Sequence, residues 1–152
     1  MSNETGIRII PPVYMASLAI IAYGLHHLWD LQLSEHGLLK MSGIALVVLA
    51  FILTFWAMFT FKQFNTTIDV RKTASKLVTQ GPFRFSRNPI YMAALVLFIG
   101  IGVWLNNYWF CLAAVILQQI LARLIIPVEE HFLKKNFTAE YESYCQQVRR
   151  WL

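Results

Sequence analysis

The sequence predicts an all-α integral membrane protein, with four transmembrane helices followed by a cytoplasmic C-terminal helical extension. Three observations lead to this fold class. Hydrophobic residues make up 57% of the chain and charged residues only 14%, whereas an average soluble domain is roughly 25% charged. The hydrophobic residues gather in four apolar stretches, each close to the roughly 20 residues that a helix needs to cross a bilayer. Lys and Arg gather in segments that would all face the same side of the membrane.

The expected spans cover about residues 12–29, 38–61, 89–105 and 108–128 of a single domain, residues 1–152. Each span is expected to be helical because lipid offers backbone N–H and C=O groups no hydrogen-bond partner. The connector between the first two spans holds two acids and no Lys or Arg, while the connector between the second and third holds six Lys or Arg and one Asp. The positive-inside rule therefore places that basic connector and both termini in the cytoplasm.

A helical tail, about residues 129–150, is predicted to follow the fourth span. Pro127 is expected to kink the helix near the membrane surface, because proline removes a backbone donor and its ring clashes with the preceding turn. Thr138 is a suitable N-cap for a separate last helix, with Glu140 in its first turn. The tail is thus predicted to have two helical parts.

The net charge of +5 indicates the lipid bilayer as a partner rather than nucleic acid. The Lys and Arg residues flank apolar stretches, where they contact anionic headgroups, and no soluble nucleic-acid-binding module accompanies them. No metal site is predicted either. Cys111 and Cys145 lack metal-ligand spacing and are expected to be free thiols, and the pair His26–His27 has no further ligand beside it.

The candidate site lies where the third and fourth predicted spans reach the cytoplasm. Only Asn106 and Asn107 separate these spans, so the two helices must be neighbours and their cytoplasmic ends must meet. The arginines of segment 84–87 then lie beside the pair Glu129–Glu130. Ionisable groups at this depth are costly unless they are paired or form a site.

The side chains expected there suit a particular chemistry. Carboxylates bind cations or ribose hydroxyls, and guanidiniums bind a carboxylate. The rings of Tyr91, Tyr141 and Tyr144 offer aromatic faces to a positive centre. A zwitterionic, nucleoside-bearing cation such as S-adenosylmethionine matches all of these groups, although composition alone makes it one guess among several.

Simpler interpretations of the same residues stay open. Arg87 is also placed as an ordinary positive-inside anchor. The pair Glu129–Glu130 has Lys134 and Lys135 at the spacing of helical surface ion pairs. Because neighbouring helix residues point about 100° apart, one of the two glutamates is expected to face the pocket, and which one is left open.

Two segments resemble a known superfamily. They are LVTQGPFRFSRNPIYMA and, one apolar hairpin later, PVEEHFLKKNFTAEYESYCQQVRRWL. Both are similar to the isoprenylcysteine carboxyl methyltransferase and phospholipid methyltransferase superfamily, whose bacterial members are small integral membrane enzymes. The resemblance covers about residues 61–152. It implies S-adenosyl-L-methionine as methyl donor, with S-adenosyl-L-homocysteine as product, in a pocket between the cytoplasmic ends of the last two spans and the C-terminal helix.

The resemblance also implies roles for individual residues. Catalytic roles fall on Arg87, Glu130 and Arg149, the last belonging to the C-terminal pair Arg149–Arg150. Cofactor-binding roles fall on the residues that match the family's motifs, which are Arg87, Asn88, Pro89, Tyr91, Glu129, Glu130, Tyr141 and Tyr144.

The chain departs from the family's pattern at a few positions. Asn88 stands where eukaryotic members have His. Glycines of the pattern are replaced by Asn65, Ala93 and Thr138. An added side chain at such positions narrows the approach of the backbone to a ligand, so these departures bear on the acceptor and on full activity.

The predicted function is methylation of a lipophilic acceptor, an isoprenylcysteine-type carboxylate or related lipid, by a membrane-embedded S-adenosylmethionine-dependent methyltransferase. The expected location is a bacterial inner membrane, with the active site cytoplasmic. The alternatives are a phospholipid N-methyltransferase and a non-catalytic membrane scaffold or assembly protein.

Overall fold

All regular secondary structure is helical in the part of the protein described by the computed structural model, which comprises residues 11–29, 31–33, 37–64 and 76–152. The elements, in chain order, are α1 (Pro11–Leu28), α2 (Gly37–Gln63), a 3₁₀ turn η1 (Gly81–Arg84), α3 (Pro89–Trp104), α4 (Tyr108–Ile120), a π-helical turn η2 (Leu121–Ile125) and α5 (Ile126–Gln147). These residues contain no strand, so the all-α prediction is confirmed for them. A helix lies over each of the four apolar stretches.

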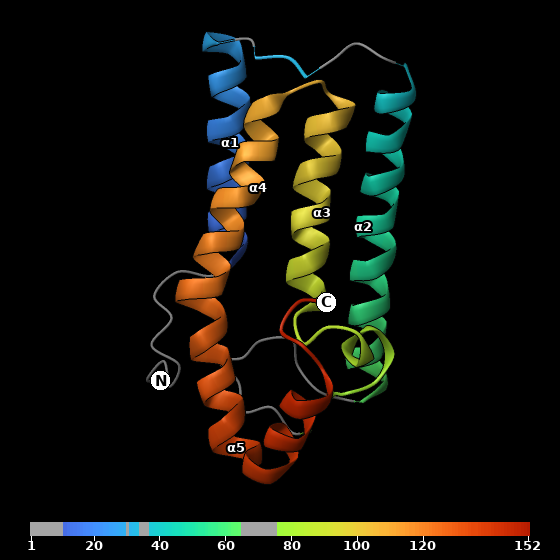
Figure 1. The fold of residues 1–152 in the computed structure, drawn as a ribbon, viewed down its shortest axis with the longest axis vertical. Coiled ribbons are helices and arrows are strands. Elements are labelled where there is room, and N and C mark those ends of the chain that lie inside the picture. The colour runs from blue at the N-terminus through green and yellow to red at the C-terminus, as the bar shows by residue number, and fades with distance from the viewer. Residues whose placement is uncertain (1–10, 30, 34–36, 65–75) are drawn as a thin grey trace.

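The four long apolar helices do not pack in chain order. Helix α3 packs between α2 and α4, and α1 packs against α4. Figure 1 accordingly shows α1 and α2 at opposite sides of the molecule, although they follow each other in the sequence. The hairpin of α3 and α4 is therefore central, as expected from the short connection between them.

Small residues allow α2 and α3 to approach closely. Gly43 of α2 faces the backbone of Trp104, and Gly100 of α3 faces the backbone of Val47. A β-carbon at either glycine would lie closer to backbone atoms than van der Waals contact permits. Glycine at such positions is typical of closely packed helices in membranes.

The turn between α3 and α4 is built by its two asparagines. Asn106 has a positive φ of 54°, a conformation that asparagine tolerates better than most residues. Asn107 is the N-cap of α4, and its side-chain oxygen accepts a hydrogen bond from the Trp109 backbone N–H at 3.0 Å. The reversal places the start of α3 and the end of the α4–α5 rod at the same end of the molecule (Figure 1).

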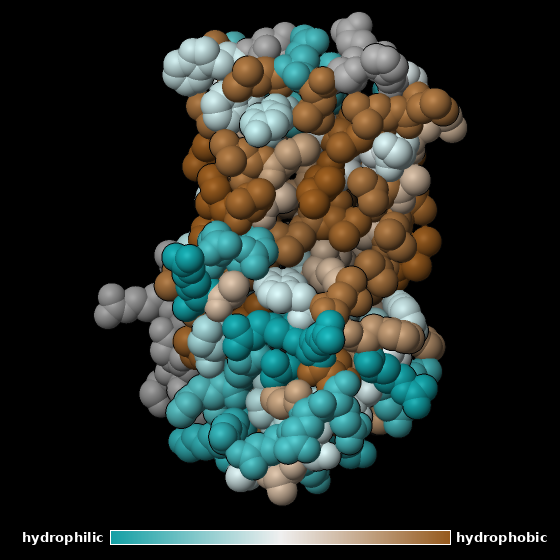
Figure 2. Space-filling view, viewed as in Figure 1, coloured by the Kyte–Doolittle hydropathy of each residue, from teal (hydrophilic) through white to brown (hydrophobic). Residues whose placement is uncertain are grey.

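The surface divides into an apolar part and a polar part. Figure 2 shows hydrophobic residues over the half of the molecule that holds α1 to α4, and hydrophilic residues over the half that holds α5 and the C-terminus. By length and composition, helix α2 and the helical run Tyr108–Gln147, called here the α4–α5 rod, are long and apolar enough to cross a membrane, and α3 is apolar but shorter. The exposed apolar surface is that of a membrane protein. The number of spans and their sidedness stay predictions.

The tail turns back on itself. The π-helical turn η2 ends two residues before Pro127, so the helix geometry changes close to the position where a kink was predicted. The sharper change is at Phe137, whose φ of −129° and ψ of 31° interrupt α5. A second helical part therefore follows Phe137, one residue before the N-cap predicted at Thr138, and runs back toward the start of α3, where the C-terminus lies (Figure 1).

Candidate functional site

A cavity of about 140 Å³ lies at the polar end of the molecule, between the end of α2, the start of α3 and both parts of α5. All of the predicted cofactor-binding residues line this cavity. They are Arg87, Asn88, Pro89, Tyr91, Glu129, Glu130, Tyr141 and Tyr144. Much of the remaining lining, called here the apolar wall, is hydrophobic and includes Phe61, Val78 and Phe83. The cavity thus joins a charged wall to an apolar one.

The segment before α3 is held in place by packing against α2. Its first turn starts at Gly81, whose φ of 60° suits glycine and whose Cα lies against the buried Thr60 of α2. Phe83 packs edge-to-face on Phe61, with ring centroids 4.9 Å apart. Pro89 then occupies the first turn of α3, where the missing N–H of proline costs no helical hydrogen bond. Arg87 is therefore held at the cavity by ordered backbone on both sides.

Arg87 is the central cation of the site. Its Nη1 lies 3.3 Å from Glu130 Oε1 and donates to Cys145 Sγ at 2.6 Å and to the Tyr141 hydroxyl at 3.4 Å. Its Nε is buried and has no hydrogen-bond partner among the described residues. A buried donor without an acceptor is costly, so Arg87 keeps one hydrogen-bond donor unused among the described residues.

The two glutamates face the cavity from different sides. Glu129, which is 9% exposed, accepts a hydrogen bond from the Tyr91 hydroxyl at 2.5 Å. Glu130 instead contacts Arg150, with Oε2 to Nη2 at 2.6 Å and Oε1 to Nε at 3.1 Å. We expected one of the pair to face the pocket, whereas both line it, because the start of α3 borders one side of α5 and the returning tail borders the other.

Two tyrosines of the tail complete the charged wall. Tyr141 and Tyr144 are both buried, and burial raises the pKa of each phenol above its ordinary value, so both hydroxyls stay protonated. The Tyr144 hydroxyl donates to the Phe83 carbonyl at 2.7 Å and ties the tail to the segment before α3. The Tyr141 ring borders the cavity beside Glu130.

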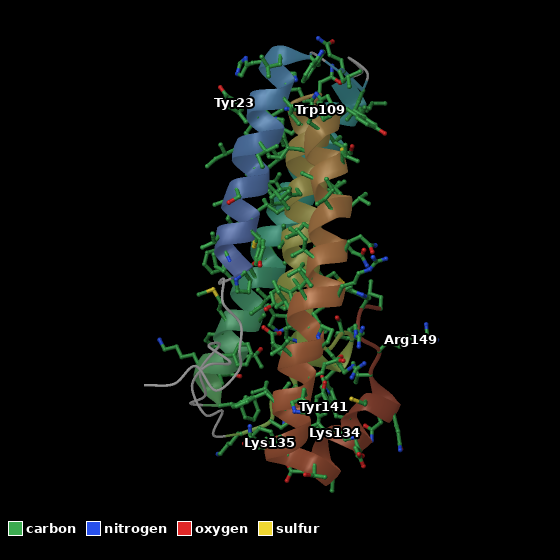
Figure 3. All side chains as sticks on the ribbon, turned by 90° about the vertical axis from the view of Figure 1, so that its left-hand side faces the viewer. Tyr23, Trp109, Lys134, Lys135, Tyr141 and Arg149 are labelled. Atoms are coloured by element: carbon green, nitrogen blue, oxygen red, sulfur yellow. The ribbon has the colours of Figure 1, made fainter. Side chains whose placement is uncertain are left out.

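The C-terminal arginines take different positions. The structure does not bring the Arg149 side chain into the cavity: it is exposed, and Figure 3 shows it at the outer edge of the molecule, away from Tyr141. The Arg150 guanidinium lies on Glu130, and this hydrogen bond raises the pKa of Arg150. Val148 has extended backbone, with φ −125° and ψ 130°, and side chains alternate along extended chain. One arginine of the pair therefore points inward and the other outward.

Several residues that shape the site were not predicted from the motifs. Ser86 is fully buried and donates a hydrogen bond to the Arg150 carbonyl at 3.2 Å. Cys145 contacts Arg87, and Lys76 borders the cavity. Ser86 lies inside the quoted motif, so its polar side chain next to Arg87 was the available signal. Cys145 and Lys76 gave none, because their contacts depend on the tail's reversal and on the segment before Gly81.

The departures from the family's pattern lie mostly away from the cavity. Ala93 is buried in α3 and is not among the cavity's lining residues. Thr138 follows the break in α5 and is exposed. Asn65 lies outside the described residues. Among the described residues, no three His, Cys, Asp or Glu residues gather in a way that would hold a metal ion.

The fold and the site define a class of protein: an all-helical membrane protein whose charged residues converge in one cavity at the polar end of its apolar helices. The family model for phospholipid methyltransferases matches residues 38–140. The chain belongs to this family, and the superfamily inferred from the two motifs is confirmed.

Two plant proteins illustrate the relationship. The chain is 34% identical over 119 residues to protein-S-isoprenylcysteine O-methyltransferase B of Arabidopsis thaliana, covering 76% of this chain and 60% of that protein. It is 31% identical over 126 residues to the probable protein-S-isoprenylcysteine O-methyltransferase of Oryza sativa subsp. indica, covering 80% of this chain and 64% of that protein. The chain thus spans about three fifths of the length of these relatives.

Proposed function

We propose that the protein is a membrane-embedded methyltransferase that uses S-adenosylmethionine to methylate a lipophilic acceptor. The observation that carries the proposal is the cavity in which Arg87, Glu129 and Glu130 meet at the polar end of the apolar helices. The family match covers this region, and the names of the relatives are those of isoprenylcysteine O-methyltransferases. A polar reactant would reach such a cavity from water and a lipophilic one from the membrane.

The residues of the cavity fit the proposed cofactor. Glu129 would accept hydrogen bonds from its ribose hydroxyls or amino group, and the unpaired Nε of Arg87 would donate to its carboxylate. The ring of Tyr141 would face its positive sulfur. The volume of about 140 Å³ is below the roughly 300–1,000 Å³ of sites that bury a whole ligand. We therefore expect the cavity to widen when the cofactor binds.

The residues of the chain would act chiefly by positioning. The bound cofactor would supply a methyl group on a sulfonium, which is a good leaving group. Holding an acceptor in line with that methyl contributes several kcal/mol, on the order of 7–11 kcal/mol in well-oriented systems. Arg87 and Arg150 would hold Glu130 in one orientation, and the apolar wall with Phe61 and Phe83 would exclude water.

The engaged state of both glutamates supports a carboxylate acceptor. An amine acceptor must lose a proton, and a glutamate would be the base. Glu130 is paired with two guanidiniums. Burial raises the pKa of the Glu129 carboxyl to about 7, but this side chain is hydrogen-bonded to Tyr91 and is assigned to the cofactor rather than to the acceptor. A carboxylate acceptor needs no base, so an isoprenylcysteine-type carboxylate or related lipid agrees best with this arrangement.

We further propose that α1, α2, α3 and the α4–α5 rod each cross the membrane once, with the C-terminal tail and the site in the cytoplasm. The polar end of the molecule carries the tail and the described end of the basic connector, residues 76–88 (Figure 1). The opposite end carries the short turn at Asn106 and Asn107. This charge distribution supports insertion of the polar end on the cytoplasmic side, in a bacterial inner membrane.

Calorimetry with S-adenosylhomocysteine tests the cofactor proposal. The purified protein in detergent is expected to bind it, and Glu129→Ala or Glu130→Ala is expected to weaken binding about tenfold or more, because a hydrogen bond to a charged group contributes roughly 1.5–3 kcal/mol. Glu140→Ala is the matched control, since Glu140 is exposed on the tail. Absence of binding by the folded wild-type protein refutes the proposal and favours the scaffold alternative.

An acceptor screen with a radiolabelled methyl donor separates the remaining alternatives. Label is expected in a prenylated cysteine carboxylate and released as methanol by mild base, because a methyl ester hydrolyses. Base-stable label in phosphatidylethanolamine would instead identify a phospholipid N-methyltransferase.

A further inference from the structure

The last residues of the chain, Val148–Leu152, form a strap that is bound by the segment before α3. The Arg87 backbone N–H donates to the Arg149 carbonyl at 3.0 Å. The next carbonyl, that of Arg150, accepts two hydrogen bonds, from Ser86 Oγ at 3.2 Å and from Asn88 Nδ2 at 3.0 Å. Residues more than 60 positions apart in sequence are thus joined mainly through backbone atoms of the strap.

The Ser86 hydroxyl makes two hydrogen bonds, one as donor and one as acceptor. While Oγ donates to the Arg150 carbonyl, it accepts a hydrogen bond from the Asn88 backbone N–H at 3.1 Å. The side chain is fully buried, so water cannot replace either bond. Serine and threonine hydroxyls can donate and accept at once, whereas alanine does neither.

The Asn88 side chain also binds the Arg150 carbonyl. It is the N-cap residue of α3, a position from which asparagine usually accepts a hydrogen bond from the first turn. Its side chain makes no such cap bond and donates to the strap instead. The segment before α3 therefore uses two polar side chains to fix a single carbonyl.

Fixing that carbonyl fixes the guanidinium attached to the same residue. Arg150 carries the bidentate contact to Glu130, and Glu130 also contacts Arg87. A shift of the strap would move Arg150 off the carboxylate and leave Glu130 held only by the longer contact to Arg87. The orientation of a cavity glutamate thus depends on a buried serine that the cavity's lining does not include.

We propose that Ser86 is a positioning residue, which holds the main chain of Arg150 so that its guanidinium keeps Glu130 oriented toward the cavity. The assignment deepens the proposed function and rests on it. One neutral hydrogen bond contributes roughly 0.5–1.5 kcal/mol, which corresponds to about two- to tenfold in affinity. Ser86→Ala should therefore weaken S-adenosylhomocysteine binding about two- to tenfold, and Ser86→Thr, which keeps the hydroxyl, should restore most of it.

A double-mutant cycle separates positioning from mere stabilisation. Arg150→Met removes the guanidinium and keeps the backbone carbonyl. In an Arg150→Met background, Ser86→Ala is expected to have no further effect on affinity, because no guanidinium is left to position. If Ser86→Ala weakens binding equally in both backgrounds, Ser86 acts by supporting α3 and the proposal is overturned. Ser143→Ala, which changes an exposed serine of the tail, is the control and should leave binding unchanged.

A measurement made without ligand tests the role of Ser86 separately from the proposed function. Trypsin can cleave after Arg149 only when the strap leaves its partners, and intact mass measures the rate of this cleavage. Ser86→Ala should therefore accelerate cleavage about two- to tenfold, whereas Ser86→Thr should not. If wild type binds no S-adenosylhomocysteine, the proposed function fails, and an unchanged cleavage rate in Ser86→Ala overturns the hold on Arg150 independently. If Ser86→Ala does not fold, Ser86→Cys, with its weaker donor, takes its place with the same expected direction.

Discussion

The guanidinium of Arg150 contacts both carboxylate oxygens of Glu130, at 2.6 Å through Nη2 and 3.1 Å through Nε. The same carboxylate lies 3.3 Å from Arg87 Nη1. One anion therefore balances two cations. Removing the anion should consequently change stability by a different amount from removing either cation. Without Glu130, two guanidiniums face each other, whereas without Arg150 the pair of Arg87 and Glu130 remains.

Substitutions of Glu130 and of Arg150 should therefore lower the free energy of unfolding by different amounts. Glu130→Gln is expected to lower the free energy of unfolding by about 1–3 kcal/mol, because a partly buried charge loses its partner. Arg150→Met is expected to cost roughly 1 kcal/mol or less, because its side chain is 38% exposed and solvent screens the pair. Thermal unfolding in detergent measures both changes.

The matched control is an ion pair at the same end of the molecule. Lys134 and Glu142 are 2.9 Å apart but 61% and 53% exposed, so Lys134→Met should leave stability unchanged within measurement. Equal losses in Arg150→Met and Glu130→Gln would contradict the two-cation arrangement.

The hydrogen bond from Tyr91 to Glu129 gives a second prediction. Tyr91→Phe removes the hydroxyl and leaves the buried Glu129 without the hydrogen bond that Tyr91 donates, which costs about 1–3 kcal/mol. Thermal unfolding should show this loss, and replacing Glu129 by Met in the Tyr91→Phe background should recover part of it, because no buried charge remains. Tyr108→Phe serves as control, since Tyr108 is exposed at the opposite end. A stable Tyr91→Phe protein would mean that this hydrogen bond contributes little.

The packing of α2 against α3 gives a third prediction. A β-carbon at Gly43 would lie 2.8 Å from the Trp104 Cα, with further backbone atoms beside it. Because backbone cannot move aside as a side chain can, Gly43→Ala should lower the unfolding free energy by about 1–3 kcal/mol.

Gly24→Ala is the control for this substitution. In the described part of the chain, no atom outside the local backbone of α1 and the two residues beside Gly24 lies within 4 Å of a β-carbon at Gly24, and alanine is favoured over glycine in a helix by up to about 1 kcal/mol. Gly24→Ala should therefore be neutral or slightly stabilising in the same unfolding experiment. Similar behaviour of the two variants would exclude a close α2–α3 contact.

Local sequence signals were sufficient for the helices. Pro89 and Asn107 mark the starts of α3 and α4 within a residue of the expected positions, because proline at the first turn and asparagine at the N-cap act through their own backbone. The meeting of Arg87 with Glu130 also followed from sequence, because a hairpin with a short turn leaves its two helices no other arrangement.

Features that depend on the tail folding back could not be predicted from the sequence. The inward side chain of the pair Arg149–Arg150 is decided by extended backbone after α5 and by the register of the strap on Ser86. No periodicity carries that register. The packing of α1 on α4 rather than α2 depends on which apolar faces fit, and these faces are too uniformly hydrophobic for a pattern to distinguish them.

The proposed membrane arrangement is testable by cysteine labelling in spheroplasts, with Cys111 and Cys145 replaced. Leu31→Cys lies at the end that holds the α3–α4 turn, whose Tyr108 donates to the Leu31 carbonyl at 3.1 Å, and it should react with a membrane-impermeant maleimide added outside. Lys135→Cys lies on the tail at the other end (Figure 3) and should react only after permeabilisation.

A lipid-facing position supplies the control for this experiment. Ile20 in the middle of α1 is 72% exposed in the protein alone, yet a bilayer would cover it. Ile20→Cys should therefore resist the maleimide before and after permeabilisation and react only in denaturant, because thiols react with maleimide as thiolates, which hydrocarbon disfavours. Labelling of Lys135→Cys in intact spheroplasts would reverse the sidedness. A fully reactive Ile20→Cys would show that α1 does not lie in the membrane and would contradict the four-span arrangement.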